Sequence, residues 1–154
     1  MELKPGYKQT EVGIIPDDWQ VRPLFSLSTE IGDGIHSTPN YVKSSEFYFI
    51  NGNNLVDDCI SITDSTMCVS EWEYKTLRKY LTDRTLLLSI NGTIGNLALY
   101  KGEQVVLGKS AAYINLAQGV PRTFISYCLK SRATSLFFEN ELTGTTIRNY
   151  HSSR

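Results

Sequence analysis

Side chains that could do chemistry gather in short polar segments that separate the apolar runs of this 154-residue chain. Imidazole, hydroxyl, amide and ammonium groups of this kind form hydrogen bonds with the edges of bases and the oxygens of phosphates. The candidate DNA-binding residues of this class are His36, Ser37, Thr38, Asn40, Tyr41, Asn91, Thr93, Lys109, Ser110, Thr145 and Arg148. The alternative for each segment is that its polar residues serve only to make a turn.

Motifs that would carry catalysis are mostly missing. A methyltransferase acting on adenine needs an Asn-Pro-Pro-aromatic motif, which the sequence lacks, and residues 92–95 are a poor substitute for a glycine-rich cofactor turn. Gly108-Lys109-Ser110 matches the end of a phosphate-binding loop, but Glu103 stands where that loop requires glycine. His36 and His151 have no Cys or Glu at ligand spacing for zinc. We therefore expect no catalysis and no bound cofactor or metal.

The strongest enzymatic alternative is a Mg²⁺-dependent nuclease. Glu73 opens a Glu-x-Lys tripeptide, and Asp57, Asp58 and Asp64 precede it as potential metal ligands. Nuclease motifs place this tripeptide on a strand, where alternate side chains reach one metal. Here Ser70 and Glu73 form a capping box, which predicts the first turn of a helix instead.

The elements that position these groups follow from apolar periodicity and turn residues. Strands are predicted at 47–50, 86–90, 97–100, 105–107 and 111–116. A tight hairpin is expected at Asn91-Gly92, and a helix of about ten residues should follow the capping box. Residues 33–41 are dense in turn formers and should be a loop. Residues 1–18 are expected to be irregular, because two prolines and two glycines interrupt them.

A longer helix is predicted from Pro121 onward, since proline favours the first helical position. Its apolar residues recur mostly three and four positions apart, which predicts an amphipathic helix packed on the sheet. The expected core residues of this helix are Phe124, Ile125, Cys128, Leu129, Leu136 and Phe137. Truncating Phe124 to alanine should then cost about 3–5 kcal/mol. The predicted fold class is α+β: a twisted, mostly antiparallel sheet with a long C-terminal helix and a shorter central helix.

Composition and charge are those of one ordinary globular domain, with a formal net charge of –1. The charge is uneven, because residues 1–100 carry 8 Lys/Arg against 13 Asp/Glu and residues 101–154 carry 7 against 3. Six C-terminal cations would suit a phosphate backbone if the fold gathered them, or else they are scattered solvated charges; they are Lys101, Lys109, Arg122, Lys130, Arg132 and Arg148. Without an apolar run near the roughly 20 residues that span a bilayer, we expect a cytoplasmic protein with no membrane contact.

Four stretches in the right order resemble the specificity subunits of type I restriction-modification systems. Residues 6–16, followed by Trp19, look like the usual opening of such subunits. Residues 33–41, Asp-Gly-Ile-His-Ser-Thr-Pro-Asn-Tyr, resemble the Asp-Gly-x-His-x-Thr-Pro segment of their recognition domain. Residues 87–96 resemble their Gly-Thr-Ile-Gly-Asn hairpin, and residues 144–147 look like the Gly-Thr-Thr that closes the domain.

The resemblance implies one DNA target-recognition domain, which reads half of a split target in double-stranded DNA and catalyses nothing. Its partners would be a methyltransferase (modification) subunit, which binds S-adenosylmethionine and methylates adenine, and indirectly a restriction subunit that uses ATP and Mg²⁺. Carried over by position, the loop at 36–41 and the hairpin at 91–95 are the segments expected near DNA.

The sequence departs from the resemblance in one large way, because the long spacer helix and the second recognition domain are not present. We therefore expect a single domain over residues 1–154, with residues 144–154 as a truncated tail lacking the spacer helix. This puts docking to the modification subunits in doubt. A third hypothesis follows, in which the chain associates with a modification subunit, or with a second copy as a homodimer, without binding DNA.

Overall fold

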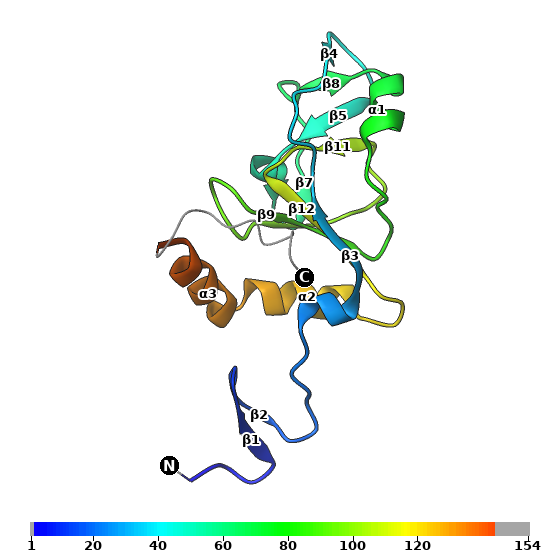
Figure 1. The fold of residues 1–154 in the computed structure, drawn as a ribbon. Helices are drawn as coiled ribbons and strands as arrows, with labels where there is room; N and C mark the ends of the chain where they lie inside the picture. Colours follow the sequence, from blue (N-terminus) through cyan, green and yellow to red (C-terminus); the bar gives the residue numbers. More distant parts are fainter. Residues whose placement is uncertain (1, 144–154) are drawn as a thin grey trace.

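A computed structural model describes residues 2–143, with side chains described up to residue 138 (Figure 1). The fold is α+β, as predicted. The longer strands are β1 Tyr7–Thr10, β2 Gly13–Pro16, β3 Ser28–Asp33, β5 Phe47–Ile50, β9 Thr85–Ser89, β10 Leu97–Leu99, β11 Val105–Leu107 and β12 Ala111–Leu116. Four two-residue strands are β4 Tyr41–Val42, β6 Leu55–Val56, β7 Cys59–Ile60 and β8 Cys68–Val69. The helices are α1 Glu71–Leu77, α2 Arg122–Lys130 and α3 Arg132–Thr143, with short 3-10 turns η1 Leu24–Leu27 and η2 Gly52–Asn54.

The described strands form two four-stranded sheets and two small hairpins, where the sequence predicted one sheet. The first sheet is antiparallel throughout, in the order β10-β9-β12-β3. The second has the order β11-β5-β8-β4, and its β11–β5 pair is parallel. Strand β11 belongs to the second sheet and β12 to the first, so the three-residue turn between these strands connects the two sheets directly.

Strand β9 contributes to a hydrophobic cluster on each face of the first sheet, because all five of its residues are buried. Alternate side chains of a strand point to opposite faces of its sheet. Leu87 accordingly packs with Ile50 and Leu107 of the second sheet, whereas Leu86 packs with Ile114 and with Ile125 of α2. The first sheet is therefore covered on one face by the second sheet and on the other by helices.

The C-terminal helical segment differs from the prediction in two respects. It consists of two helices, because Ser131 leaves the helical conformation and caps the next helix by accepting a hydrogen bond from the Thr134 N–H at 3.4 Å. Burial is also less than predicted: Ile125 is buried, but Phe124 is 48% exposed and Phe137 is 51% exposed. Cys128 and Leu136 are exposed as well, while Leu129 is partly buried. The expected apolar face is thus only partly packed on the sheet.

Helix α1 confirms the predicted helix start, although it is shorter than expected. The Ser70 hydroxyl accepts a hydrogen bond from the Glu73 N–H at 3.1 Å, which is the first half of the capping box. The Glu73 carboxylate instead accepts a hydrogen bond from the Asn40 side chain at 3.3 Å. Ser70 therefore caps the helix as predicted, whereas Glu73 links the helix to the loop before β4.

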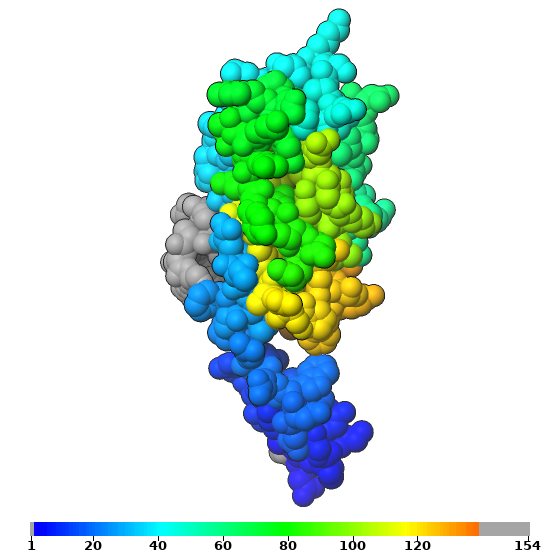
Figure 2. Space-filling view, turned by 90° about the vertical axis from the view of Figure 1, so that its right-hand side faces the viewer, coloured from blue at the N-terminus to red at the C-terminus, as the bar shows by residue number. Residues whose placement is uncertain are grey.

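Residues 7–16, expected to be irregular, form the antiparallel hairpin β1–β2. The Thr10 hydroxyl stabilises its turn by donating to the Gly13 carbonyl at 2.7 Å. Figure 2 shows this hairpin as a separate lobe at the end of the molecule, joined to the body by a narrow segment. Trp19 in that segment makes an edge contact with Phe124, at a ring distance of 6.1 Å. Within the described chain, no helix is both long and apolar enough to cross a membrane.

Two tyrosines, the buried Tyr113 and the partly buried Tyr100, make the stability of this fold sensitive to alkaline pH. Burial raises the pKa of Tyr100 to about 12, from an ordinary value of 10.0, and also raises the pKa of Tyr113, whose hydroxyl donates to Glu30 at 2.7 Å. A raised folded-state pKa means that the fold favours the neutral phenol. This contribution to stability is complete below pH 10 and is lost as the pH rises toward 12.

We expect the urea midpoint of unfolding to fall steeply between pH 10 and 12. The Tyr113→Phe protein keeps the ring and loses one ionisation, so its midpoint should be lower at pH 8 but decline less over the alkaline range. A wild-type midpoint that stays constant across this range would contradict the role assigned to these phenols.

Candidate nucleic-acid interface

Four segments that are distant in sequence meet where β3, β5 and β9 end and where β11 turns into β12. The Ile35 N–H donates to the Leu107 carbonyl at 2.8 Å, and the Gly108 N–H donates to the Ile50 carbonyl at 2.7 Å. The Ile90 N–H donates to the Ser110 carbonyl at 3.0 Å. We call this meeting point of residues 34–35, 50–52, 89–90 and 107–111 the strand junction. Its backbone hydrogen bonds fix the starting points of the loops that leave it.

Gly34 and Gly108 lie at points of the strand junction where neighbouring atoms come too close for a side chain. A Cβ atom on Gly34 would overlap the carbonyl groups of Leu107 and Gly108. A Cβ atom on Gly108 would overlap the side-chain amide of Asn51. Neither glycine has the positive φ that would by itself favour glycine. Their role is therefore to allow close approach of the backbone.

Asn51 and Ser110 form the polar centre of the strand junction. The Ser110 hydroxyl donates to the Asn51 side-chain oxygen at 2.8 Å and accepts from the Gly52 N–H at 2.8 Å. The Asn51 N–H in turn donates to the Asn54 side-chain oxygen at 2.9 Å. The Ser110 hydroxyl, predicted to contact DNA, is thus engaged within the protein and positions the turn. Nothing local in the sequence marks Asn51 as the partner of a residue 59 positions away.

Three of the predicted loops leave the strand junction side by side. His36 follows Ile35, which pairs with Gly108 as an isolated parallel bridge. Lys109 is exposed in the turn between β11 and β12, and Asn91 follows Ile90, which bonds to the next residue of that turn. Exposed Ser37 and Thr38 lie in the first loop and exposed Thr93 lies in the β9–β10 hairpin loop. His36, Asn91 and Lys109 are therefore presented from one rigid point.

The His36 side chain is held in place by a neighbouring carboxylate. Its Nε2 atom lies 2.6 Å from Oδ2 of Asp33, and the His36 side chain is 61% exposed. Asp33 is the last residue of β3, so the partner of the imidazole is part of the sheet. This contact gives the exposed imidazole a defined orientation.

Asn40 and Tyr41, the last two candidates of the first loop, make their contacts with α1 and β5 and not at the strand junction. The Asn40 amide donates to Glu73 of α1, and the Tyr41 ring packs against Phe49 at a ring distance of 5.8 Å. Tyr41 borders a polar pocket of about 350 Å³. Asn51, Asn53, Asn54, Ser61, Thr63 and Thr66 are among the residues that line this pocket. Asn51 belongs to both the pocket and the strand junction, so the two features adjoin.

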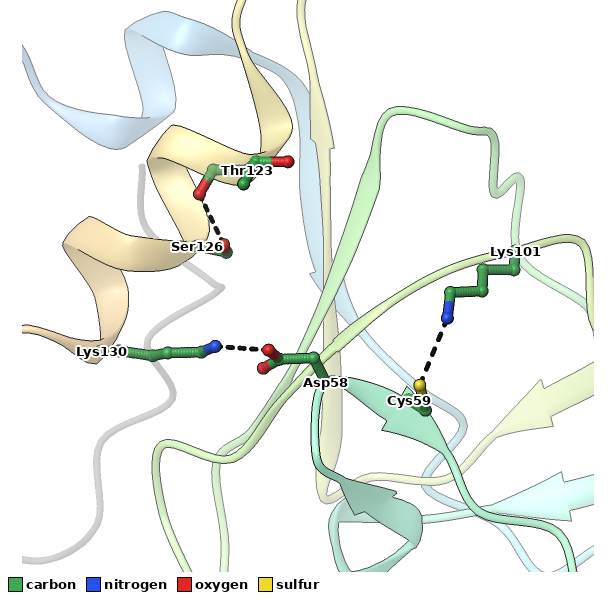
Figure 3. A network of polar contacts seen from close by, with 6 residues as sticks. All are labelled: Asp58, Cys59, Lys101, Thr123, Ser126 and Lys130. Carbon is green, nitrogen blue, oxygen red and sulfur yellow. Dashed lines mark hydrogen bonds and ion pairs between the residues drawn. The ribbon is translucent and has the colours of Figure 1, made fainter.

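Three of the C-terminal cations that could have contributed to a basic surface are engaged by groups of the protein itself. Lys130 forms a 2.6 Å ion pair with Asp58, and Lys101 donates to the Cys59 sulfur at 3.3 Å (Figure 3). The Arg122 guanidinium donates to the carbonyls of Thr85 and Tyr100 at 3.1 and 2.6 Å. These three cations are therefore engaged within the protein, although they lie near one another: Lys130 and Lys101 contact the neighbouring residues Asp58 and Cys59, and Lys101 and Arg122 line the same pocket. The candidates Thr145 and Arg148 lie outside the described residues.

The nuclease hypothesis gains no support from the placement of its residues. Glu73 lies in the first turn of α1, as the capping box predicted. Asp57 and Asp58 form the tight turn of the β6–β7 hairpin, where both have positive φ, and Asp58 is paired with Lys130. Within residues 2–138, no three His, Cys, Asp or Glu side chains are close enough together to hold a metal ion.

Comparisons with known proteins add no family to this description. No protein-family model matches the chain, and no curated protein matches it in sequence. The arrangement of the strand junction and its loops is therefore the basis for assigning a function.

Proposed function

We propose that this chain is a DNA target-recognition module of the kind found in the specificity subunits of type I restriction-modification systems. It binds double-stranded DNA with sequence preference and leaves chemistry to its partners. The observation that carries the proposal is the convergence of His36, Asn91 and Lys109 on loops that start at one strand junction.

The chemistry of these three side chains suits a duplex. An amide such as that of Asn91 pairs with the edge of adenine, and an imidazole can donate to base acceptors in the major groove. A lysine ammonium is a point charge on a flexible stem, which favours a phosphate contact over a base contact. Loops anchored on a sheet hold such groups in a fixed arrangement, and this lowers the entropy cost of binding.

The proposal places this chain in a larger complex. A methyltransferase subunit carrying S-adenosylmethionine would methylate adenine at the site that the chain selects. A restriction subunit using ATP and Mg²⁺ would join indirectly, and the complex would work in the cytoplasm. The chain itself then needs no cofactor.

Replacing Lys109 by alanine tests the phosphate contact. Binding should weaken by similar factors on a duplex selected from a random library and on a scrambled duplex. The slope of log affinity against log salt should become shallower by about one, because one phosphate contact is lost. Fluorescence anisotropy at several salt concentrations measures both quantities, and an unchanged slope in the Lys109→Ala protein would remove this role.

Replacing Asn91 or His36 by alanine should produce a different pattern. Losing a base contact should weaken binding to the selected duplex by about 1–3 kcal/mol and leave binding to the scrambled duplex nearly unchanged. Asn96→Ala, directly after the same hairpin loop and not a candidate for binding, provides a control for general disturbance of the loop. Equal losses on both duplexes would show that these side chains do not read bases.

A second candidate function, association with a protein partner, is favoured by an apolar surface near α3. An open apolar pocket of about 330 Å³ lies between η1, the first sheet and α3, and exposed Phe25 and Phe137 border it. Exposed apolar patches of this kind often mark protein interfaces. Size-exclusion chromatography in high salt, alone and with a modification subunit, separates the two functions, because DNA-mediated association is lost in high salt.

A further inference from the structure

Helix α1 and the residues after it expose an unusual combination of aromatic and basic side chains. Trp72 is 71% exposed and Tyr80 is 74% exposed. Three cations lie between them in sequence, and a polar pocket of about 400 Å³ runs along this surface. We call the surface along this pocket the basic-aromatic patch; it consists of Tyr74, Lys75, Arg78, Lys79 and Tyr80. None of these residues was a DNA-binding candidate from the sequence, although Lys75 ends the Glu-x-Lys tripeptide of the nuclease hypothesis.

The Arg78 guanidinium is held in place by stacked rings. Tyr74 stacks on Phe47 of β5, at a ring distance of 4.8 Å and an angle of 29°. The guanidinium carbon of Arg78 lies 5.5 Å from the centre of the Tyr74 ring. A guanidinium stacked on a ring keeps the N–H groups along its edge available for an anion. The second sheet therefore supports Arg78 through two aromatic rings.

The exposed Tyr80 stands on a backbone that is anchored in the core. The side-chain amide of buried Asn115 donates to the Tyr80 carbonyl at 2.8 Å. The Asn115 side-chain oxygen accepts from the buried Thr85 hydroxyl at 2.5 Å. A buried polar network of this kind holds its surroundings rigidly. The exposure of the Tyr80 ring is thus a defined feature of the fold and not that of a loose loop.

The net charge of the patch is positive. Lys75 is paired with Glu71 at 3.0 Å, and both side chains are well exposed. Among the described residues, no hydrogen bond or ion pair engages the side chains of Arg78 and Lys79. These two cations differ in this respect from Lys101, Arg122 and Lys130, which the protein uses internally. The patch therefore presents at least two cations to a ligand.

We propose that the basic-aromatic patch binds the phosphate backbone of duplex DNA without regard to sequence. This inference rests on the proposed function, which it extends from base reading to a separate backbone contact. The Asn40–Glu73 hydrogen bond joins α1 to the loop that carries His36. Tyr80 is anchored beside the start of β9, whereas the strand junction lies where β9 ends, so a duplex on the junction reaches the patch by extending along the length of β9. Cations interleaved with rings are suited to phosphates and sugars.

The test compares two double variants of equal charge. Arg78→Gln with Lys79→Gln removes two cations from the patch. Lys8→Gln with Arg22→Gln removes one lysine and one arginine of similar exposure from the N-terminal hairpin region. Each protein is titrated with a labelled pool of random 20-base-pair duplexes between about 50 and 200 mM salt, where phosphate contacts dominate affinity. Circular dichroism confirms that each variant is folded.

We expect the patch variant to lose about tenfold or more in affinity and its salt slope to become shallower by about two, while the control variant stays within twofold of wild type. An unchanged salt slope in the patch variant would contradict phosphate binding by the basic-aromatic patch. If the wild type still enriched particular duplexes, the proposed function would remain supported. Pool binding that depends on the patch without any enrichment supports the patch and rejects sequence reading. Wild type that binds no duplex, or binds only phosphatidylserine vesicles, overturns the patch.

Discussion

Replacing Gly34 by alanine should destabilise the protein by about 3 kcal/mol or more, toward the upper end of what overpacking costs. The new methyl group would occupy space taken by the carbonyls of Leu107 and Gly108. Those atoms are backbone and cannot rotate away, so the strand junction itself must open. Urea unfolding followed by tryptophan fluorescence measures the loss, and DNA binding should fall with it because all three loops start there.

Gly102→Ala is the matched control for this substitution. It adds the same methyl group, and its Cβ atom would meet nothing within 4 Å, although φ at this position is +93°. Its cost should therefore be limited to backbone strain of about 1–2 kcal/mol. If Gly34→Ala proved no more destabilising than Gly102→Ala, this result would contradict the close approach of Gly34 to the Leu107 and Gly108 carbonyls.

Replacing Ile114 by alanine should cost about 2–5 kcal/mol, far more than the same truncation of Phe124. Ile114 is 2% exposed in β12, the strand that pairs with both β9 and β3. Phe124 is half exposed, so its truncation should cost about 1 kcal/mol, chiefly by losing the contact with Trp19.

This pair of variants separates two views of the helical segment. The periodicity of residues 124–137 predicted a buried Phe124, with a cost of about 3–5 kcal/mol. The structure instead places the main core in the sheets. Equal costs for Ile114→Ala and Phe124→Ala would instead support a buried Phe124 and contradict the exposure described here.

Elements with strong local signals were predictable from the sequence. The apolar runs of β11 and β12 were predicted at their observed bounds, and the capping residue Ser70 marked the start of α1. Strand β3 was missed because its residues, Ser28–Asp33, are mostly polar and it is held by long-range pairing with β12. The break at Ser131 was missed because apolar spacing continues across it, whereas the cap depends on a single hydroxyl.

The candidate site was likewise predictable only in part. Composition alone identified the loops that carry His36, Asn91 and Lys109, since polar turn formers between strands are visible locally. Their convergence was not predictable, because it depends on contacts between residues more than fifty positions apart, such as Asn51 and Ser110. The basic-aromatic patch was not predictable either, because it depends on the stacking of Tyr74 of α1 on Phe47 of β5.

The central claim is that this chain recognises duplex DNA by sequence. It is tested most directly by incubating the wild-type protein with a library of random duplexes at low salt and sequencing the bound fraction over several rounds. One module with few phosphate contacts should bind weakly, with Kd values of about 10⁻⁴–10⁻⁶ M for arbitrary DNA, and tighter for its preferred site. The account predicts that one short sequence becomes enriched, and that the Asn91→Ala protein fails to enrich it. A bound fraction with the same sequence composition as the starting library would contradict it.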